Sequence, residues 1–197
     1  MFNYESGKRY TIIGFGGYLT LSIISLLFSA VWYVLANSIV QNLLIGRLLS
    51  LATIASLLIA AGGFGIMWLE QRKFIDFVTA GTVGISAVLR IFNSFRPANL
   101  LYFSGKATYA SASMLSLLIS LLLAIFYIVL SVRAFQFNKI FSLLLVLAFL
   151  YTIFSGMLIS IFYAKLGIPL FIVLCVREFG YVVCAALCFL ECKQEQY

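Results

Sequence analysis

The sequence has 197 residues, of which 64% are hydrophobic and only 10% are charged, and its mean hydropathy is +1.13. A typical soluble domain is about 45–50% apolar and about 25% charged, so side chains this apolar would not fit inside a soluble globule of this size. The composition therefore excludes a soluble protein and indicates an integral membrane protein surrounded by membrane lipids. The net charge of +7 comes from Lys and Arg near the ends of apolar segments, where membrane proteins carry anchoring cations, so we expect no nucleic-acid partner.

Six apolar segments follow one another along the chain, each long enough to cross a bilayer as a helix of about 20 residues. They are predicted to be residues 10–36, 43–68, 74–92, 109–132, 141–164 and 169–190. Each segment is continuously apolar, without the alternation of polar and apolar residues that marks a membrane β-strand. The predicted fold is therefore an all-α integral membrane protein, a bundle of six transmembrane helices in a single domain over residues 1–197, with its longest polar connection at residues 93–108.

The connections between the segments carry unequal numbers of cations. Seven Lys and Arg residues fall on the side of the two termini, and five fall on the other side. Because cytoplasmic loops are enriched in Lys and Arg, this excess predicts that both termini are cytoplasmic.

The first and fourth segments share a serine pattern. Residues 18–29 read YLTLSIISLLFS and residues 109–120 read YASASMLSLLIS, so six of twelve positions match. On a helix this spacing puts the three serines of each segment on one face: Ser22, Ser25 and Ser29, and Ser113, Ser116 and Ser120. Two units of three spans would run in opposite directions, which is the 3+3 inverted repeat of many transporters. The alternative is that small residues on one face let helices pack closely.

Arg177 and Glu178 are the strongest candidate functional residues because they lie near the middle of the sixth segment. A charge at the centre of a bilayer costs several kcal/mol, so both side chains should face the protein interior or water. Adjacent helical residues point about 100° apart, so we expect the two side chains to reach different neighbours. As functional groups, Glu178 would carry protons or coordinate a cation, and Arg177 would bind an anionic substrate or a carboxylate. The alternative is a structural ion pair with another span, for example with Asp76 or Arg90.

The third segment supplies the remaining candidates. Asp76, Ser86 and Arg90 belong to a stripe of small and polar residues that follows helical i, i+3, i+4 spacing. This stripe would line an aqueous path for a substrate or an ion. The alternative is that it packs against other helices.

Several kinds of chemistry have no support in the residue pattern. The chain has no histidine, and its four cysteines fall in the last segment: Cys175, Cys184, Cys188 and Cys192. Three of the cysteines form a row along one helix that is too extended to enclose a tetrahedral metal ion, so we expect packing residues. The Gly-rich stretches at 14–17 and 62–65 match no nucleotide-binding loop. We therefore expect no catalytic residue, cofactor or metal ion, although an intramembrane enzyme built from several helices stays open.

These features favour a non-enzymatic membrane permease for a small solute or an ion, or the membrane subunit of a transport complex. The candidate pathway residues are Arg177, Glu178, Asp76, Ser86 and Arg90. The alternative function is a non-catalytic structural or assembly subunit of a larger membrane complex. Either function allows contacts with other membrane subunits or with a second copy of the chain.

Overall fold

The computed structural model describes residues 3–35, 39–95 and 106–194. In these residues the chain forms six long helices: α1 (Tyr4–Leu35), α2 (Ile39–Gln71), α3 (Phe74–Phe95), α4 (Lys106–Ala134), α5 (Lys139–Ser160) and α6 (Leu170–Gln194). A short π-helical turn, η2 (Ile161–Lys165), follows α5. Each of the six helices contains a stretch that is long and apolar enough to cross a membrane. The predicted fold class is confirmed: the chain is an all-α, multi-pass membrane protein.

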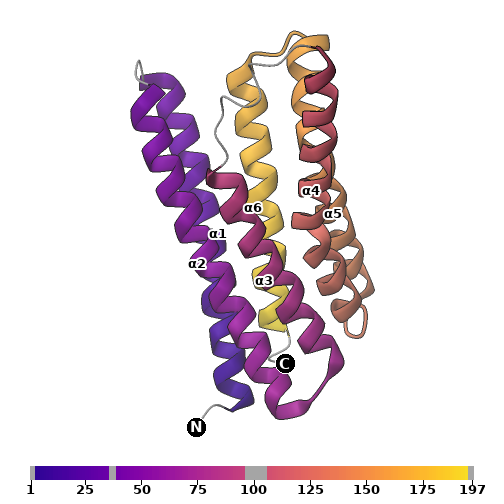
Figure 1. Cartoon of the computed structure of the whole chain (residues 1–197). Helices are drawn as coiled ribbons and strands as arrows, with labels where there is room; N and C mark the ends of the chain where they lie inside the picture. The colour runs from indigo at the N-terminus through magenta and orange to yellow at the C-terminus, as the bar shows by residue number, and fades with distance from the viewer. Residues whose placement is uncertain (1–2, 36–38, 96–105, 195–197) are drawn as a thin grey trace.

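The helices stand side by side in an elongated bundle (Figure 1). Each helix contacts the next one along the chain, and α1 also contacts α6, so the six helices form a closed ring. The starts of α1, α3 and α5 and the ends of α2, α4 and α6 share one end of the bundle, which we call the terminal end. The other end is called the opposite end. The placement of the terminal end in the cytoplasm stays a prediction.

Side-chain caps set the first residues of two helices. α1 begins at Tyr4 rather than at the predicted Tyr10, because Asn3 and Ser6 cap it reciprocally. The Asn3 side-chain oxygen accepts a hydrogen bond from the Ser6 backbone N–H (2.9 Å), and the Ser6 hydroxyl accepts one from the Asn3 N–H (3.0 Å). Asn138 caps α5 by accepting hydrogen bonds from two backbone N–H groups in the first turn. The hydropathy pattern does not register these caps because they are polar.

The helices on both sides of the predicted polar connection are longer than expected. α3 extends to Phe95 and α4 begins at Lys106, so both helices enter the predicted segment 93–108, whose residues 96–105 lie outside the described residues. The inverted repeat stays a prediction, because the side chains of Ser29, Ser113 and Ser116 are also outside the described part of the chain.

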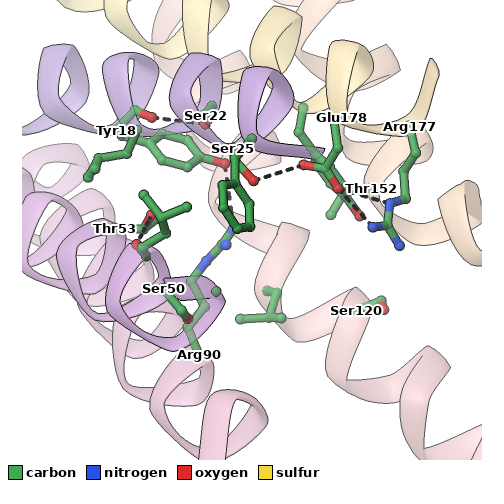
Figure 2. A pocket seen from close by; sticks show the side chains of 16 residues that line it. Tyr18, Ser22, Ser25, Ser50, Thr53, Arg90, Ser120, Thr152, Arg177 and Glu178 are labelled. Atoms are coloured by element: carbon green, nitrogen blue, oxygen red, sulfur yellow. Dashed lines mark hydrogen bonds and ion pairs between the residues drawn. The ribbon is translucent and has the colours of Figure 1, made fainter. Parts of the chain in front are cut away.

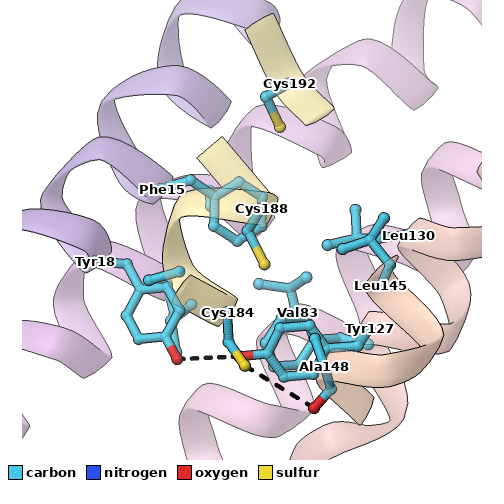
Figure 3. Close-up of a cluster of buried hydrophobic side chains, with 14 of the residues drawn as sticks. Phe15, Tyr18, Val83, Tyr127, Leu130, Leu145, Ala148, Cys184, Cys188 and Cys192 are labelled. Carbon is cyan, nitrogen blue, oxygen red and sulfur yellow. Dashed lines mark hydrogen bonds between the residues drawn. The ribbon is translucent and has the colours of Figure 1, made fainter. Parts of the chain in front are cut away.

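The hydrophobic core fills the half of the bundle nearer the terminal end. Its fully buried apolar side chains include Phe15, Leu57, Phe64, Leu130 and Leu145. Figure 3 shows part of this cluster, where the cysteines of α6 point toward side chains of the neighbouring helices. The outward faces of the helices carry many exposed Leu, Ile, Val and Phe side chains, as contact with lipid tails requires.

α1 and α2 pack with their backbones in close approach. A Cβ atom added at Gly7 would lie 2.9 Å from the Gly63 carbonyl oxygen, and one added at Gly63 would lie 2.6 Å from the backbone nitrogen of Thr11. A Cβ atom at Gly14 would likewise meet backbone atoms of α2. Glycine at these positions therefore allows a helix–helix contact that any side chain would prevent, as small residues do in many membrane helices.

The α1–α2 contact gives a first testable prediction. We expect Gly14→Ala to lower the free energy of unfolding in detergent by about 1–3 kcal/mol, because the new methyl group forces two backbones apart. The matched control is Gly62→Ala on the same helix pair, where an added Cβ meets nothing within 4 Å. Thermal unfolding of both purified variants measures the difference. Equal melting temperatures would contradict the close approach of the two backbones.

Candidate functional site

A polar cavity of about 470 Å³ lies between the helices, and Figure 2 shows it from close by. Its lining residues lie further from the terminal end than most of the core residues do. Side chains from all six helices line it, and the cavity is partly open to the surface. Most of its described lining residues are polar, and six of them carry aliphatic hydroxyl groups: Ser22, Ser25, Ser50, Thr53, Ser120 and Thr152. The charged residues among the described lining are Arg90, Arg177 and Glu178. Polar side chains in a membrane protein usually face such a cavity or a partner, so this cavity is the candidate functional site.

Arg177 and Glu178 bind each other, contrary to the expectation that they reach different neighbours. The guanidinium of Arg177 folds back along α6, and its Nε and Nη2 donate to Glu178 Oε1 at 3.1 and 2.8 Å. The second oxygen of Glu178 accepts a hydrogen bond from the Ser25 hydroxyl of α1 at 3.3 Å. The expectation failed because it used the directions of the Cα–Cβ bonds, whereas the Arg side chain is long enough to bend back. The Arg177 side chain is 34% exposed and that of Glu178 is 14% exposed, so the pair borders the cavity rather than the dry core.

A tyrosine of α5 supports the backbone that carries this pair. The Tyr151 hydroxyl donates to the backbone carbonyl of Arg177 at 2.8 Å. Its ring occupies the space that a side chain at Gly180 would need. Gly180 therefore lets Tyr151 reach the α6 backbone and hold it at Arg177, a member of the ion pair.

Arg90 reaches the cavity from α3 and rests on an aromatic base. Its guanidinium carbon lies 5.6 Å from the ring centroid of Tyr18, and its Nη2 donates a long hydrogen bond (3.5 Å) to the Tyr18 hydroxyl. That hydroxyl lies 3.2 Å from the hydroxyl of Tyr127 on α4. Both tyrosines are buried, so Arg90 stands at the boundary between the cavity and the core. Sequence reasoning found Arg90 but neither tyrosine, because tyrosine at that depth is not distinguishable from other core residues.

The structure separates the other sequence-predicted residues from this cavity. Ser86 is buried and donates to the Leu123 carbonyl of α4 at 3.4 Å, so it joins two helices. Asp76 is buried at the terminal end, in a second polar cluster. Of the predicted third-segment stripe, only Arg90 lines the cavity as described. From the serine patterns, Ser22, Ser25 and Ser120 do line it.

The second polar cluster joins α3, α4 and α6 by buried charges. Arg133 Nη1 donates to Asp76 Oδ1, and Arg133 Nε lies 3.3 Å from Glu191 Oε1. The guanidinium carbon also lies 4.9 Å from the ring centroid of Phe64, and the Cys192 thiol donates to Glu191 Oε2 at 3.3 Å. One cation and two carboxylates give the cluster a formal charge of −1. We call these three charged residues the buried charge cluster.

Sequence reasoning missed Arg133 and Glu191 in this cluster. It treated both as flanking residues, yet the Arg133 side chain is 5% exposed and that of Glu191 is 0% exposed. A signal was present: Cys184, Cys188 and Glu191 follow i, i+4, i+7 spacing, so one face of α6 continues from the cysteine row into the carboxylate. The cysteines were expected to be packing residues, and Cys184, Cys188 and Cys192 are indeed buried and form no disulfide. Within the described residues, no group of three metal-ligating side chains forms a metal site.

Comparison with known proteins gives no match: no protein-family model, no curated protein sequence and no solved structure is significantly similar to the chain. The geometry of the two polar clusters is therefore the basis for any functional conclusion.

The buried charge cluster predicts a large effect of removing its cation. Arg133→Leu leaves the carboxylates of Asp76 and Glu191 buried without their cation, which should cost about 3–5 kcal/mol of stability. Asp76→Asn in the Arg133→Leu background should restore part of that loss. Thermal unfolding in detergent measures both changes.

Two control substitutions separate this effect from the general loss of a cation. Lys139→Leu removes an exposed cation at the same end of the bundle and should change stability by less than about 0.5 kcal/mol. Arg177→Leu removes the partly exposed ion pair with Glu178 and should lower the free energy of unfolding by at most about 1 kcal/mol. A ranking in which Arg133→Leu is no worse than Arg177→Leu would refute the buried charge cluster.

The cavity predicts different solvent access at two serines on one face of α4. Ser120 lines the cavity, whereas Ser131, three turns further along that face, is buried and hydrogen-bonded to Ser142. In a Cys175→Ser background, a membrane-impermeant maleimide added at the opposite end should label Ser120→Cys and leave Ser131→Cys unlabelled. Equal labelling of both variants, or of neither, would contradict the hydrated cavity.

Proposed function

We propose that this protein is a non-enzymatic permease that binds a small solute in the polar cavity and carries it across the membrane. The observation that carries the proposal is a cavity of about 470 Å³ that is lined by all six helices and contains three charged side chains. Ligand sites in proteins have volumes of about 300–1,000 Å³, so the cavity has room for a small solute.

The composition of the cavity wall supports solute binding over simple helix packing. Packing between membrane helices needs small side chains, but it does not need charged ones, and a charge in hydrocarbon is unfavourable. Arg90, Arg177 and Glu178 come from two helices and face one shared space. Water or a solute in the cavity lowers the free-energy cost of placing these charges inside the membrane. A transport site contains such water or solute.

The closed base of the cavity supports access from one side at a time. Between Arg90 and the terminal end, buried apolar side chains fill the bundle. Closer to the terminal end, the buried charge cluster joins α3, α4 and α6. Permeases with alternating access hold a solute site near the middle of the membrane and close one side while the other is open. In this proposal the buried charge cluster is the closed gate at the terminal end, and opening that end would separate Arg133 from Asp76 or Glu191.

The alternative function is a structural or assembly subunit of a larger membrane complex. A second form of the transport function is the membrane subunit of a transport complex. An assembly subunit would need no hydrated interior, so the polar cavity that reaches Glu178 favours transport. Stable co-purification with other membrane subunits would favour a complex.

A substitution that fills the cavity tests the permease proposal. Purified protein in proteoliposomes is assayed for uptake of a panel of labelled sugars, amino acids, organic acids and inorganic ions. We expect uptake of at least one solute, and we expect Ser120→Trp to abolish that uptake because the indole ring occupies the cavity.

The matched control is Leu118→Trp, two residues earlier on α4, where the native side chain is 50% exposed on the outside of the bundle. This variant should transport at the wild-type rate. Uptake by Ser120→Trp at the wild-type rate would show that the solute does not pass through the cavity. The absence of uptake of every member of the panel by the wild-type protein would overturn the permease proposal in favour of an assembly subunit.

A further inference from the structure

We propose that the cavity binds a small hydroxylated organic monoanion, with its carboxylate at Arg90 and its hydroxyl groups donating to the serine and threonine side chains of the wall. This inference rests on the proposed function, because it names the class of solute that the same cavity takes. Three properties of the wall lead to it: its net charge, the arrangement of its cations and the direction of its hydrogen bonds.

The charged groups that line the cavity favour an anion. Arg90 and Arg177 contribute +2 and Glu178 contributes −1, so the described lining has a net charge of +1. The carboxylate of Glu178 already accepts hydrogen bonds from Arg177 on one oxygen and from Ser25 on the other. A cationic solute would have to compete with these donors for Glu178, whereas an anion would offset the excess positive charge.

The position of Arg90 favours a carboxylate as the anionic group. The planar guanidinium rests against the Tyr18 ring at the base of the cavity, and this contact fixes its orientation. A guanidinium fork binds carboxylates through two parallel hydrogen bonds. A phosphate monoester would also fit such a fork, but its charge of about −1.5 to −2 exceeds the +1 of the lining, whereas a single carboxylate matches it.

Four hydroxyl groups of the wall favour hydrogen-bond donors on the solute. Ser22 donates to the Tyr18 carbonyl at 2.8 Å, Thr53 to that of Leu49 at 2.8 Å, and Thr152 to that of Ala148 at 2.9 Å. The Ser25 hydroxyl donates to Glu178. Carbonyl and carboxylate oxygens only accept, so each hydroxyl uses its single proton within the protein and offers only lone pairs to the cavity.

These hydroxyl groups belong to α1, α2 and α5, and Figure 2 shows Ser22, Ser25, Thr53 and Thr152 around the same space as Arg90. A solute that binds them directly carries O–H or N–H groups at several positions. A plain carboxylate or an inorganic halide has none. A carboxylate on a chain of hydroxyl-bearing carbons has both the charge and the donors.

Binding of matched probes to the purified full chain tests the inference. The probes are gluconate, hexanoate, glucose and protonated glucosamine, which are similar in size. Gluconate is a hydroxylated anion, hexanoate is an anion without hydroxyl groups, glucose is neutral, and protonated glucosamine is a cation. Isothermal titration should show that gluconate binds about tenfold or more tightly than each of the other three probes, since each lacks either the anion or the donors. Equal or tighter binding of hexanoate, glucose or glucosamine, or the absence of gluconate binding, would overturn the inference.

Three substitutions assign the contacts. Arg90→Gln should weaken gluconate binding by about tenfold or more. Thr53→Val should weaken gluconate binding by about two- to tenfold and leave hexanoate binding unchanged, because hexanoate has no hydroxyl donor for Thr53. Glu178→Gln raises the lining charge from +1 to +2 and should strengthen gluconate binding. Wild-type gluconate affinity in Arg90→Gln, or weaker affinity in Glu178→Gln, would contradict the assigned roles.

The ligand-free melting temperature of each variant shows whether it folds. If Arg90→Gln does not fold, Arg90→Lys replaces it, since it keeps the charge without the fork and should also weaken gluconate binding. Failure of this inference is distinguishable from failure of the proposed function. Gluconate binding without uptake in proteoliposomes would refute the permease and keep the solute class, whereas uptake of a different solute without gluconate binding would refute the solute class and keep the permease.

Discussion

The guanidinium of Arg133, held between the carboxylates of Asp76 and Glu191, is the interaction on which the rest of the bundle depends. A charge surrounded by hydrocarbon is stable only beside an opposite charge or water, so α3, α4 and α6 must meet at this level. The same α3 and α6 carry the charged residues of the cavity, Arg90 on one and Arg177 with Glu178 on the other. The spacing of the charges at one end of the bundle is therefore constrained by an ion cluster at the other end.

The two polar sites have opposite signs. Among the described residues, the lining of the cavity has a formal charge of +1, the buried charge cluster has a formal charge of −1, and an apolar core separates them. Because the apolar core keeps the two sites apart and Coulomb interactions weaken with distance, each site favours ions of the opposite sign. An anion of the proposed class would be attracted as far as Arg90, and the carboxylates beyond the core would oppose its further movement. In the proposed permease, this arrangement would retain the solute until the bundle changes shape.

The membrane spans could be predicted from the sequence because a run of twenty apolar residues has few structural solutions in a bilayer. The predicted segments lack the polar ends of the helices, such as the turn capped by Asn3, because hydropathy does not register hydrogen bonds. The candidate site could be predicted only as a set of charged residues. Arg90 and Asp76 share one stripe of α3, yet they belong to different sites because they lie at different depths. The pairing of Arg177 with Glu178 and the burial of Glu191 depend on side-chain rotamers and on helix neighbours, which no linear pattern contains.

α1 and α2 form an antiparallel hairpin whose contact at Gly7, Gly14 and Gly63 requires nothing from the later helices. Membrane helices insert first and associate afterwards, and a chain leaves the ribosome from its N-terminus, so this hairpin is able to assemble while the remaining helices are still being made. The charged residues of α6 that line the cavity are synthesised last. Arg177 and Glu178 arrive only with α6, and Glu191 reaches Arg133 later still. Biosynthesis thus supplies the α1–α2 hairpin first, and the polar cavity is completed when the final helix docks.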